Sequence, residues 1–129
     1  MSDKDNAVAH AARILTNACH DAALTAGWWG GNGKPDPRDN PMCFSQKLML
    51  VVSELAEAME GDRKGLYDTH LPNRLMREVE LADALIRIFD MADAYGMDIG
   101  GAIAEKMAYN LIRADHKPES RAALGGKSY

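Results

Sequence analysis

Apolar residues recur every three or four positions over most of the chain, which is the period of an α-helix. The pattern covers four segments with approximate limits 6–26, 44–62, 75–95 and 99–115. The composition agrees with this, because 47% of the residues are hydrophobic, only 6% are aromatic and 8 are methionine. We therefore expect an all-α protein built on four helices.

The length of 129 residues predicts a single domain over 1–129. Two stretches interrupt or follow the helical pattern. Residues 27–41 are dense in Gly, Pro, Asn and Asp and predict a loop that carries Trp28 and Trp29. Residues 116–129 are polar and predict a C-terminal tail, while glycines and a proline between 61 and 73 predict the break between the second and third helices. Asp98 is expected to cap the fourth helix.

Charge and composition exclude several classes of protein. The net charge of -4 argues against a nucleic-acid partner, which selects a basic surface. Cys19 and Cys43 are too few for a disulfide framework or a zinc site of paired cysteines. The first residues lack the pattern of a signal peptide, and no window approaches the roughly 20 apolar residues of a membrane span. We expect a cytoplasmic protein of a bacterium or phage-infected cell, with no membrane partner.

Carboxylates occupy unusual positions in the second helix. Glu54 and Glu57, in the stretch SELAEAME, are three residues apart, so they share a helix face and repel each other. The apolar residues 48, 49, 51, 52, 55, 56, 58 and 59 wind onto the other, broad side. We expect that apolar side to face the core.

The third helix places Glu80, Asp83, Arg87 and Asp90 on one narrow stripe, and most of its remaining circumference is apolar. Such a helix is expected to be largely buried. Buried carboxylates are costly unless they are paired or bound to metal, and the stripe holds one arginine. The carboxylates of the two helices together predict an all-oxygen site for Mg²⁺, or for Mn²⁺ in its place.

The fourth helix has an apolar side and a polar one. Residues 103, 107, 111 and 112 are expected to face the core. Lys106, Asn110 and Arg113 recur at helical spacing on another face, where they form a cationic and amide stripe.

Taken in order, these motifs resemble the MazG-like branch of the all-α nucleoside triphosphate pyrophosphohydrolases. They comprise ExxE at Glu54 and Glu57, ExxD after 22 further residues, and KxxxNxxR from Lys106 to Arg113. The resemblance covers the chain from the tryptophan loop to the GGKSY end, and the compact chain is similar to the phage-type branch. Many members carry another acidic residue just ahead of ExxE, where this chain has Val52 and Ser53, so the number of metal ions stays open.

The resemblance implies a four-helix-type protomer that assembles as a homodimer or homotetramer, with active sites at a subunit interface. It implies magnesium-dependent hydrolysis of a nucleoside triphosphate between the α and β phosphates, giving a monophosphate and pyrophosphate. Glu54, Glu57, Glu80 and Asp83 would hold metal, and Glu57 or Glu54 would orient the attacking water. Lys106, Asn110 and Arg113 would contact the phosphates or the sugar. We expect a purine substrate, guanine ahead of adenine.

Other interpretations remain. The carboxylates can form a solvated helix face, and the residues of the KxxxNxxR motif can form an ordinary surface. Trp28 and Trp29 can anchor the core or stack on a nucleobase. The dipeptide His20-Asp21 resembles part of the HD phosphohydrolase signature without its further histidines. Di-iron bundles use Glu-x-x-His, which this chain lacks. The alternative of another class is a catalytically silent nucleotide-binding or assembly module.

Overall fold

The computed structural model describes residues 2–129, and these are all-helical, as the sequence predicts. The α-helices are α1 (Asp3–Thr25), α2 (Cys43–Lys64), α3 (Met76–Ala94), α4 (Ile99–Ile112) and α5 (Pro118–Ala122). Contacts divide the chain into two compact units. One is Leu15–Met97, and the other joins Met1–Ile14 to Asp98–Tyr129. The expectation of one domain over 1–129 stays a prediction.

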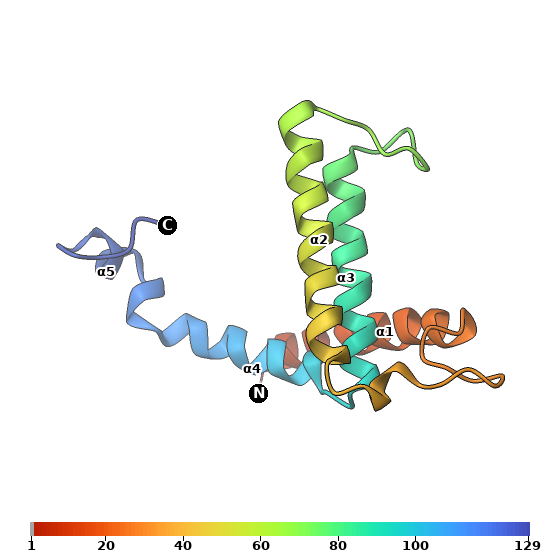
Figure 1. The fold of residues 1–129 in the computed structure, drawn as a ribbon. Helices are drawn as coiled ribbons and strands as arrows, with labels where there is room; N and C mark the ends of the chain where they lie inside the picture. The colour runs from red at the N-terminus through yellow and green to blue at the C-terminus, as the bar shows by residue number, and fades with distance from the viewer. Residues whose placement is uncertain (1) are drawn as a thin grey trace. The chain divides into compact units, whose positions relative to one another are not determined.

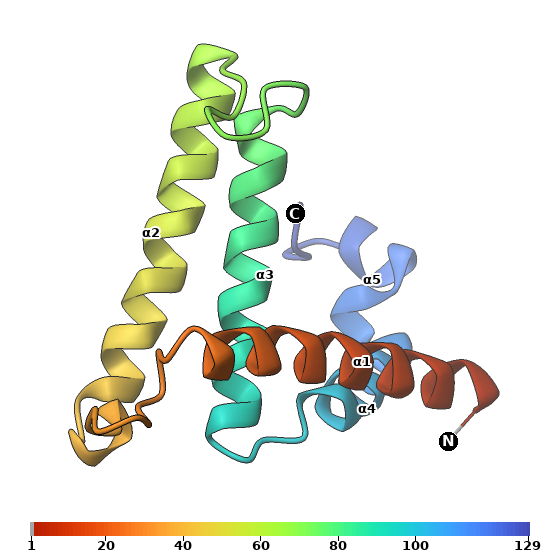
Figure 2. The same ribbon diagram turned by 90° about the vertical axis from the view of Figure 1, so that its right-hand side faces the viewer.

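The larger unit is built on α2 and α3, which lie side by side and run in opposite directions (Figures 1 and 2). The helices approach closely at Gly61, where an added Cβ would lie 2.8 Å from the Cβ of Met76. The break between the second and third helices begins within 61–73, as predicted, and α2 continues to Lys64, slightly beyond the expected limit near residue 62. The helix ends at Gly65, whose φ of 61° is the left-handed conformation that glycine adopts most readily.

The core of this unit consists of two small clusters. In the first, Trp29, Cys43 and Ala94 are buried, with Ala23 and Tyr95 packed against them. In the second, Val51, Ala84 and Met91 are buried, with Phe44 and Ile88 alongside. The tryptophan loop, the end of α1 and the helix pair are thereby joined in one unit.

Only part of the broad apolar side that the sequence predicts for α2, namely Val51 and Ala58, is buried within this chain. The residues of α2 that are buried are Cys43, Val51, Glu54, Ala58 and Gly61. The apolar side chains of Leu48, Met49, Val52, Leu55 and Met59 are 45% to 62% exposed. The reason is geometric: the close approach at Gly61 turns its stripe inward, and Glu54, at the same helical phase, goes with it.

The expectation that α3 is largely buried is also wrong for this chain by itself. Leu81, Leu85 and Ile86 are 51%, 52% and 49% exposed. Only one stripe of α3, which includes Ala84 and Met91, faces α2 and the clusters of the core. A helix that is apolar over most of its circumference needs more than one packed neighbour to be covered.

In the smaller unit, α4 begins at Asp98, whose carboxylate accepts a hydrogen bond from the Gly101 amide at 3.1 Å, as predicted. The buried residues of α4 are Gly100 and Ala104, and Gly100 lies against α1, where an added Cβ would be 2.7 Å from the carbonyl oxygen of Ala9. The predicted core side of α4 is not covered within this chain by itself, because Met107, Leu111 and Ile112 are 45%, 81% and 71% exposed.

The end of the chain is more ordered than a polar tail suggests. Helix α4 stops at Ile112 rather than near residue 115, and a 3₁₀ turn over Ala114–His116 follows. Proline then opens the short helix α5. The Asp115 carboxylate joins these segments, since it accepts hydrogen bonds from Arg113 at 2.5 Å and from Lys127 at 3.0 Å.

Candidate metal centre and adjoining cavity

Three glutamates of the larger unit meet between α2 and α3. Oxygens of Glu54, Glu57 and Glu80 all lie within 4.8 Å of one another. The spacing of three residues puts the first two on one face of α2, and the antiparallel neighbour brings Glu80 of α3 to the same level. Glu54 is buried, Glu80 is half-buried and Glu57 is exposed, so the group opens to solvent on the Glu57 side.

The repulsion between the carboxylates of the cluster is reduced in two different ways, one at Glu54 and one at Glu80. Burial acts to raise the pKa of Glu54, but hydrogen bonds outweigh it and leave that pKa below its usual range. The strongest of these comes from Arg87, whose Nε lies 2.8 Å from Glu54 Oε1. Burial, a hydrogen bond to Glu54 and the charge of Glu57 together raise the pKa of Glu80 to about 7. Arg87 and, below about pH 7, a proton on Glu80 thus offset the repulsion among the carboxylates.

A divalent cation fits this set of donors. All three groups are carboxylates, the ligands that Mg²⁺ and Mn²⁺ prefer, and they converge from two helices whose spacing is fixed by packing at Gly61. Burial and the neighbouring carboxylates, which raise the pKa of Glu80, make a third ionised carboxylate costly, and a bound cation would offset that cost. Glu54, Glu57 and Glu80 are therefore the residues that can hold the metal.

Asp83, the fourth predicted ligand, stands beside the three glutamates rather than among them. It is half-buried, one turn along α3 from Glu80, and it is absent from the group whose oxygens lie within 4.8 Å. Burial raises the pKa of Asp83, and the charge of Glu54 raises it further. Asp68 adds to this effect from the loop between α2 and α3, where it is 8% exposed and accepts hydrogen bonds from the amides of residues 70 and 71.

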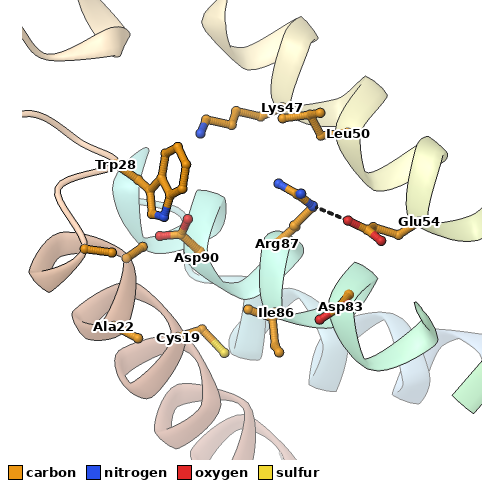
Figure 3. Close-up of a pocket in the computed structure, with 12 residues that line it drawn as sticks. Cys19, Ala22, Trp28, Lys47, Leu50, Glu54, Asp83, Ile86, Arg87 and Asp90 are labelled. Carbon is orange, nitrogen blue, oxygen red and sulfur yellow. Dashed lines mark hydrogen bonds and ion pairs between the residues drawn. The ribbon is translucent and has the colours of Figure 1, made fainter. Parts of the chain in front are cut away.

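A cavity of about 610 Å³ adjoins the carboxylates in the same unit (Figure 3). Asp83 and Glu54 line it on one side, and Ala22 and Ala23 of α1, with Ala26 just after that helix, line it on another. Lys47, Arg87 and Trp28 also line it, so the cavity combines two cations with an aromatic ring. Its size and mixed lining suit a small molecule that carries both an apolar ring and negative charge.

The two tryptophans have different environments. Trp29 is 3% exposed, and its indole nitrogen donates to Asp90 Oδ1 at 2.8 Å. The same oxygen lies 2.8 Å from Nδ1 of His20, so Asp90 ties α1, the tryptophan loop and α3 together. His20, of the HD dipeptide, thus serves a structural network. Trp28 is 68% exposed at the cavity, so it alone presents an open ring to a ligand.

The predicted residues of the fourth helix belong to the smaller unit. Lys106 Nζ lies 4.7 Å from the centre of the Tyr109 ring, and Arg113 donates to Asn110 Oδ1 at 3.5 Å and to Asp115. Arg113 therefore already has a carboxylate partner within its own unit. The structure does not test whether these three residues join the carboxylates of the larger unit, which stays a prediction.

Sequence reasoning assigned no role to Lys47 or Asp68, and it counted Arg87 only as the counter-charge in a stripe. A signal for Lys47 was present, because it precedes Glu54 by seven residues and therefore shares its helix face. Asp68 had no such signal, because it lies in a loop whose path periodicity does not describe.

Comparisons of the chain with protein-family models, with curated proteins and with solved structures find no match. Within residues 2–129, no helix is both long enough and apolar enough to cross a membrane.

Proposed function

We propose that this chain is a magnesium-dependent nucleoside triphosphate pyrophosphohydrolase of the MazG-like type. It cleaves a ribo- or deoxyribonucleotide between its α and β phosphates and so controls a nucleotide pool. The observation that carries the proposal is the group of Glu54, Glu57 and Glu80, whose oxygens lie within 4.8 Å of one another. Carboxylates gathered this closely at a cavity with two cations favour a site for a metal-bound polyphosphate over a solvated helix face.

Glu54, Glu57 and Glu80 would hold the cation, with Asp83 next to them at the cavity. Magnesium or manganese bound there would screen the negative charge of the phosphates and of the departing pyrophosphate. Asp83 lines the cavity beside Glu54, and its carboxylate would accept hydrogen bonds from water there.

Glu57 is the residue that we assign to the attacking water. It is the exposed member of the group, whereas Glu54 is buried and paired with Arg87. Water bonds to one of the two phosphorus atoms joined by the α–β oxygen, and the bond from that phosphorus to the bridging oxygen breaks. The Glu57 carboxylate accepts the proton, and pyrophosphate and a monophosphate are released.

The cavity would hold the rest of the nucleotide. Trp28 offers an open ring on which a base can stack, opposite the small side chains of α1. Asp90 lines the same cavity and is an acceptor. Guanine presents two adjacent donors, N1–H and its amino group, to such an acceptor, whereas each of the other bases presents a single donor group beside acceptors. This supports a preference for GTP or dGTP. Lys106, Asn110 and Arg113 remain proposed contacts of the phosphates or sugar.

Self-association is part of this proposal. On α2 and α3, the side chains of Leu48, Met49, Val52, Leu55, Met59, Leu81 and Leu85 are 45% to 62% exposed. So many exposed apolar side chains on two neighbouring helices are more typical of an interface than of a free surface. A homodimer or homotetramer would cover it, and sedimentation that shows only a monomer at micromolar concentration would contradict this part.

The proposed function is tested with a panel of ribo- and deoxyribonucleoside triphosphates and magnesium, with chromatographic separation of the products. We expect monophosphate and pyrophosphate rather than diphosphate and phosphate, and guanine nucleotides at the head of the ranking. Faster turnover of adenine or pyrimidine nucleotides would overturn the guanine preference alone.

The matched variants are Glu57→Ala and Glu60→Ala, one turn apart on α2. Glu60 pairs with Arg63 and Lys64 on the surface and does not belong to the cluster. Pyrophosphate release should be lost in Glu57→Ala and kept in Glu60→Ala, with both proteins folded by circular dichroism. Absence of turnover on every nucleotide in the wild-type protein, with metal binding intact, would favour the silent binding module.

A further inference from the structure

Arg87 connects the carboxylate cluster to the cavity. Its Nε lies 2.8 Å from Glu54 Oε1, so it is the direct counter-ion of the most buried carboxylate of the cluster. Its side chain is 40% exposed, compared with 10% for Glu54, and it lines the cavity. Figure 3 shows the guanidinium beside the Glu54 carboxylate, at the end of a side chain that points away from α3 into the opening. Arg87 therefore pairs with a buried carboxylate while its own side chain remains accessible from the cavity.

A divalent cation at Glu54 would change what Arg87 can do. Glu54 is one of the three groups that can hold the metal, so metal and guanidinium are competing positive charges on a single carboxylate. Two positive charges a few ångströms apart repel each other. A partly exposed arginine on a flexible stem can move away without being buried elsewhere.

A second cation lies in the same cavity. Lys47 lines it from α2, and its Nζ is 4.6 Å from the centre of the Trp29 ring. Among the salt bridges of residues 2–129, none involves Lys47. The cavity thus presents one ammonium with no carboxylate partner and one guanidinium whose partner is a metal-ligand candidate. Both are suited to phosphate oxygens.

We propose that Arg87 is a metal-released phosphate ligand: it pairs with Glu54 in the metal-free chain, and a divalent cation frees it to bind phosphate together with Lys47. The inference rests on the proposed function and deepens it, because it locates the phosphates of the substrate within the larger unit. It also implies that metal and polyphosphate bind cooperatively, since the first ligand releases a group that the second requires.

The test measures the two ligands separately on the full chain. Mn²⁺ binding without phosphate is followed by the electron paramagnetic resonance signal of the free ion. Binding of inorganic triphosphate is followed by calorimetry at saturating Mg²⁺. In Arg87→Gln, Mn²⁺ should bind about tenfold more tightly, because a competing charge is gone. Triphosphate should bind about tenfold more weakly, because a charge-assisted hydrogen bond is lost.

Two variants serve as comparisons. Lys47→Met should weaken triphosphate binding and leave Mn²⁺ affinity unchanged, since Lys47 is not bonded to the cluster. Arg77→Gln removes another arginine of α3, one that pairs with Asp62 of α2 at 2.5 Å with both side chains more than half exposed. It should change neither affinity. Thermal melts establish that each variant is folded.

Each outcome decides the matter. Opposite changes of the two affinities in Arg87→Gln support the proposal. If Arg87→Gln weakens both ligands, or leaves triphosphate binding unchanged, Arg87 only supports Glu54 and the proposal is wrong. The opposite changes without hydrolysis of any nucleotide would overturn the proposed function alone. Pyrophosphate release by the wild-type protein, with parallel changes in Arg87→Gln, would overturn this inference alone.

Discussion

The helix pair of the larger unit is built in contrasting ways at two neighbouring levels. At one level, Gly61 of α2 meets Met76 of α3 with no room for an added Cβ. At the next, Glu57 and Glu80 face the interface together with Glu54. Glu57 and Glu80 each lie four residues, about one helical turn, from the contact. One level is held by close packing, and the other contains groups that repel.

The difference shows how a helix pair can hold charges that would otherwise separate it. Close contact at Gly61 fixes the distance between the helices, while the clusters around Val51 and Trp29 hold them further along. The carboxylates then have a rigid frame, and their repulsion appears as a raised pKa of Glu80 instead of as separation of the helices. A frame that already holds carboxylates close together would suit the metal site that we propose.

The largest effect is expected when Glu54→Ala is compared with Asp62→Ala. Both remove a carboxylate of α2 that pairs with an arginine of α3, but only Glu54 belongs to the cluster. We expect pyrophosphate release to fall about 10³-fold or more in Glu54→Ala, because a metal ligand is lost. Asp62→Ala should remain within about twofold of wild type. Equal rates of pyrophosphate release for the two variants would show that the cluster takes no part in hydrolysis.

Gly61→Ala disrupts the close contact between Gly61 of α2 and Met76 of α3. The new Cβ would meet the Cβ and Cγ of Met76 at 2.8 Å, so the helices must shift apart. We expect the free energy of unfolding to fall by about 2 kcal/mol in denaturant titration. Elsewhere in a helix, the same substitution would stabilise, because alanine has the higher helix propensity. Mn²⁺ affinity should fall as well, because the carboxylates separate. Unchanged metal binding in a destabilised protein would show that the two levels are independent.

These same residues show how much of the fold and of the candidate site can be predicted from the sequence. Helical periodicity located all the major helices, and the spacing of Glu54 and Glu57 grouped them correctly, since residues three apart share a face in any helix. The inward face of α2 was predicted only in part: Val51 and Ala58 are buried, but Glu54 is buried with them. The apolar side is wide, and the deciding contact is a glycine, which carries no hydropathy signal. Asp68 was missed for the related reason that loop paths depend on tertiary contacts.

Two arginines of α3 pair with carboxylates of α2, and removing each arginine should change the free energy of unfolding by a different amount. Without metal, Arg87→Gln leaves Glu54, which is 10% exposed, without its cation, and we expect a loss of about 1–2 kcal/mol in unfolding free energy. Arg77→Gln breaks a pair whose side chains are 57% and 59% exposed and should cost at most about 0.5 kcal/mol. Saturating Mg²⁺ should largely restore Arg87→Gln and leave Arg77→Gln unchanged. Equal losses without metal would argue against a special environment for Glu54.

The smallest effect concerns pH and follows from Glu80. Its pKa is raised from 4.5 to about 7 in the folded chain, so the native state keeps a proton that the unfolded chain releases between those values. Stability of the metal-free protein should therefore fall as pH rises from about 4.5 to 7 and change little through this group above that. Mg²⁺ must displace the proton at low pH and finds an ionised carboxylate at high pH, so it should raise the melting temperature more at pH 8 than at pH 6. A difference of about 4 °C corresponds to roughly 1 kcal/mol for a chain of this size.

The matched variant for this pH effect is Glu80→Gln, which keeps the size of the side chain and removes its titration. Its melting temperature should depend less on pH between 4.5 and 7, and the gain from Mg²⁺ should become small and equal at pH 6 and pH 8. If the wild-type protein gains equally from Mg²⁺ at both pH values, Glu80 does not exchange its proton for the metal. The cluster would then consist of Glu54 and Glu57 alone, with Glu80 acting as a neutral hydrogen-bond donor to Glu54 between the helices.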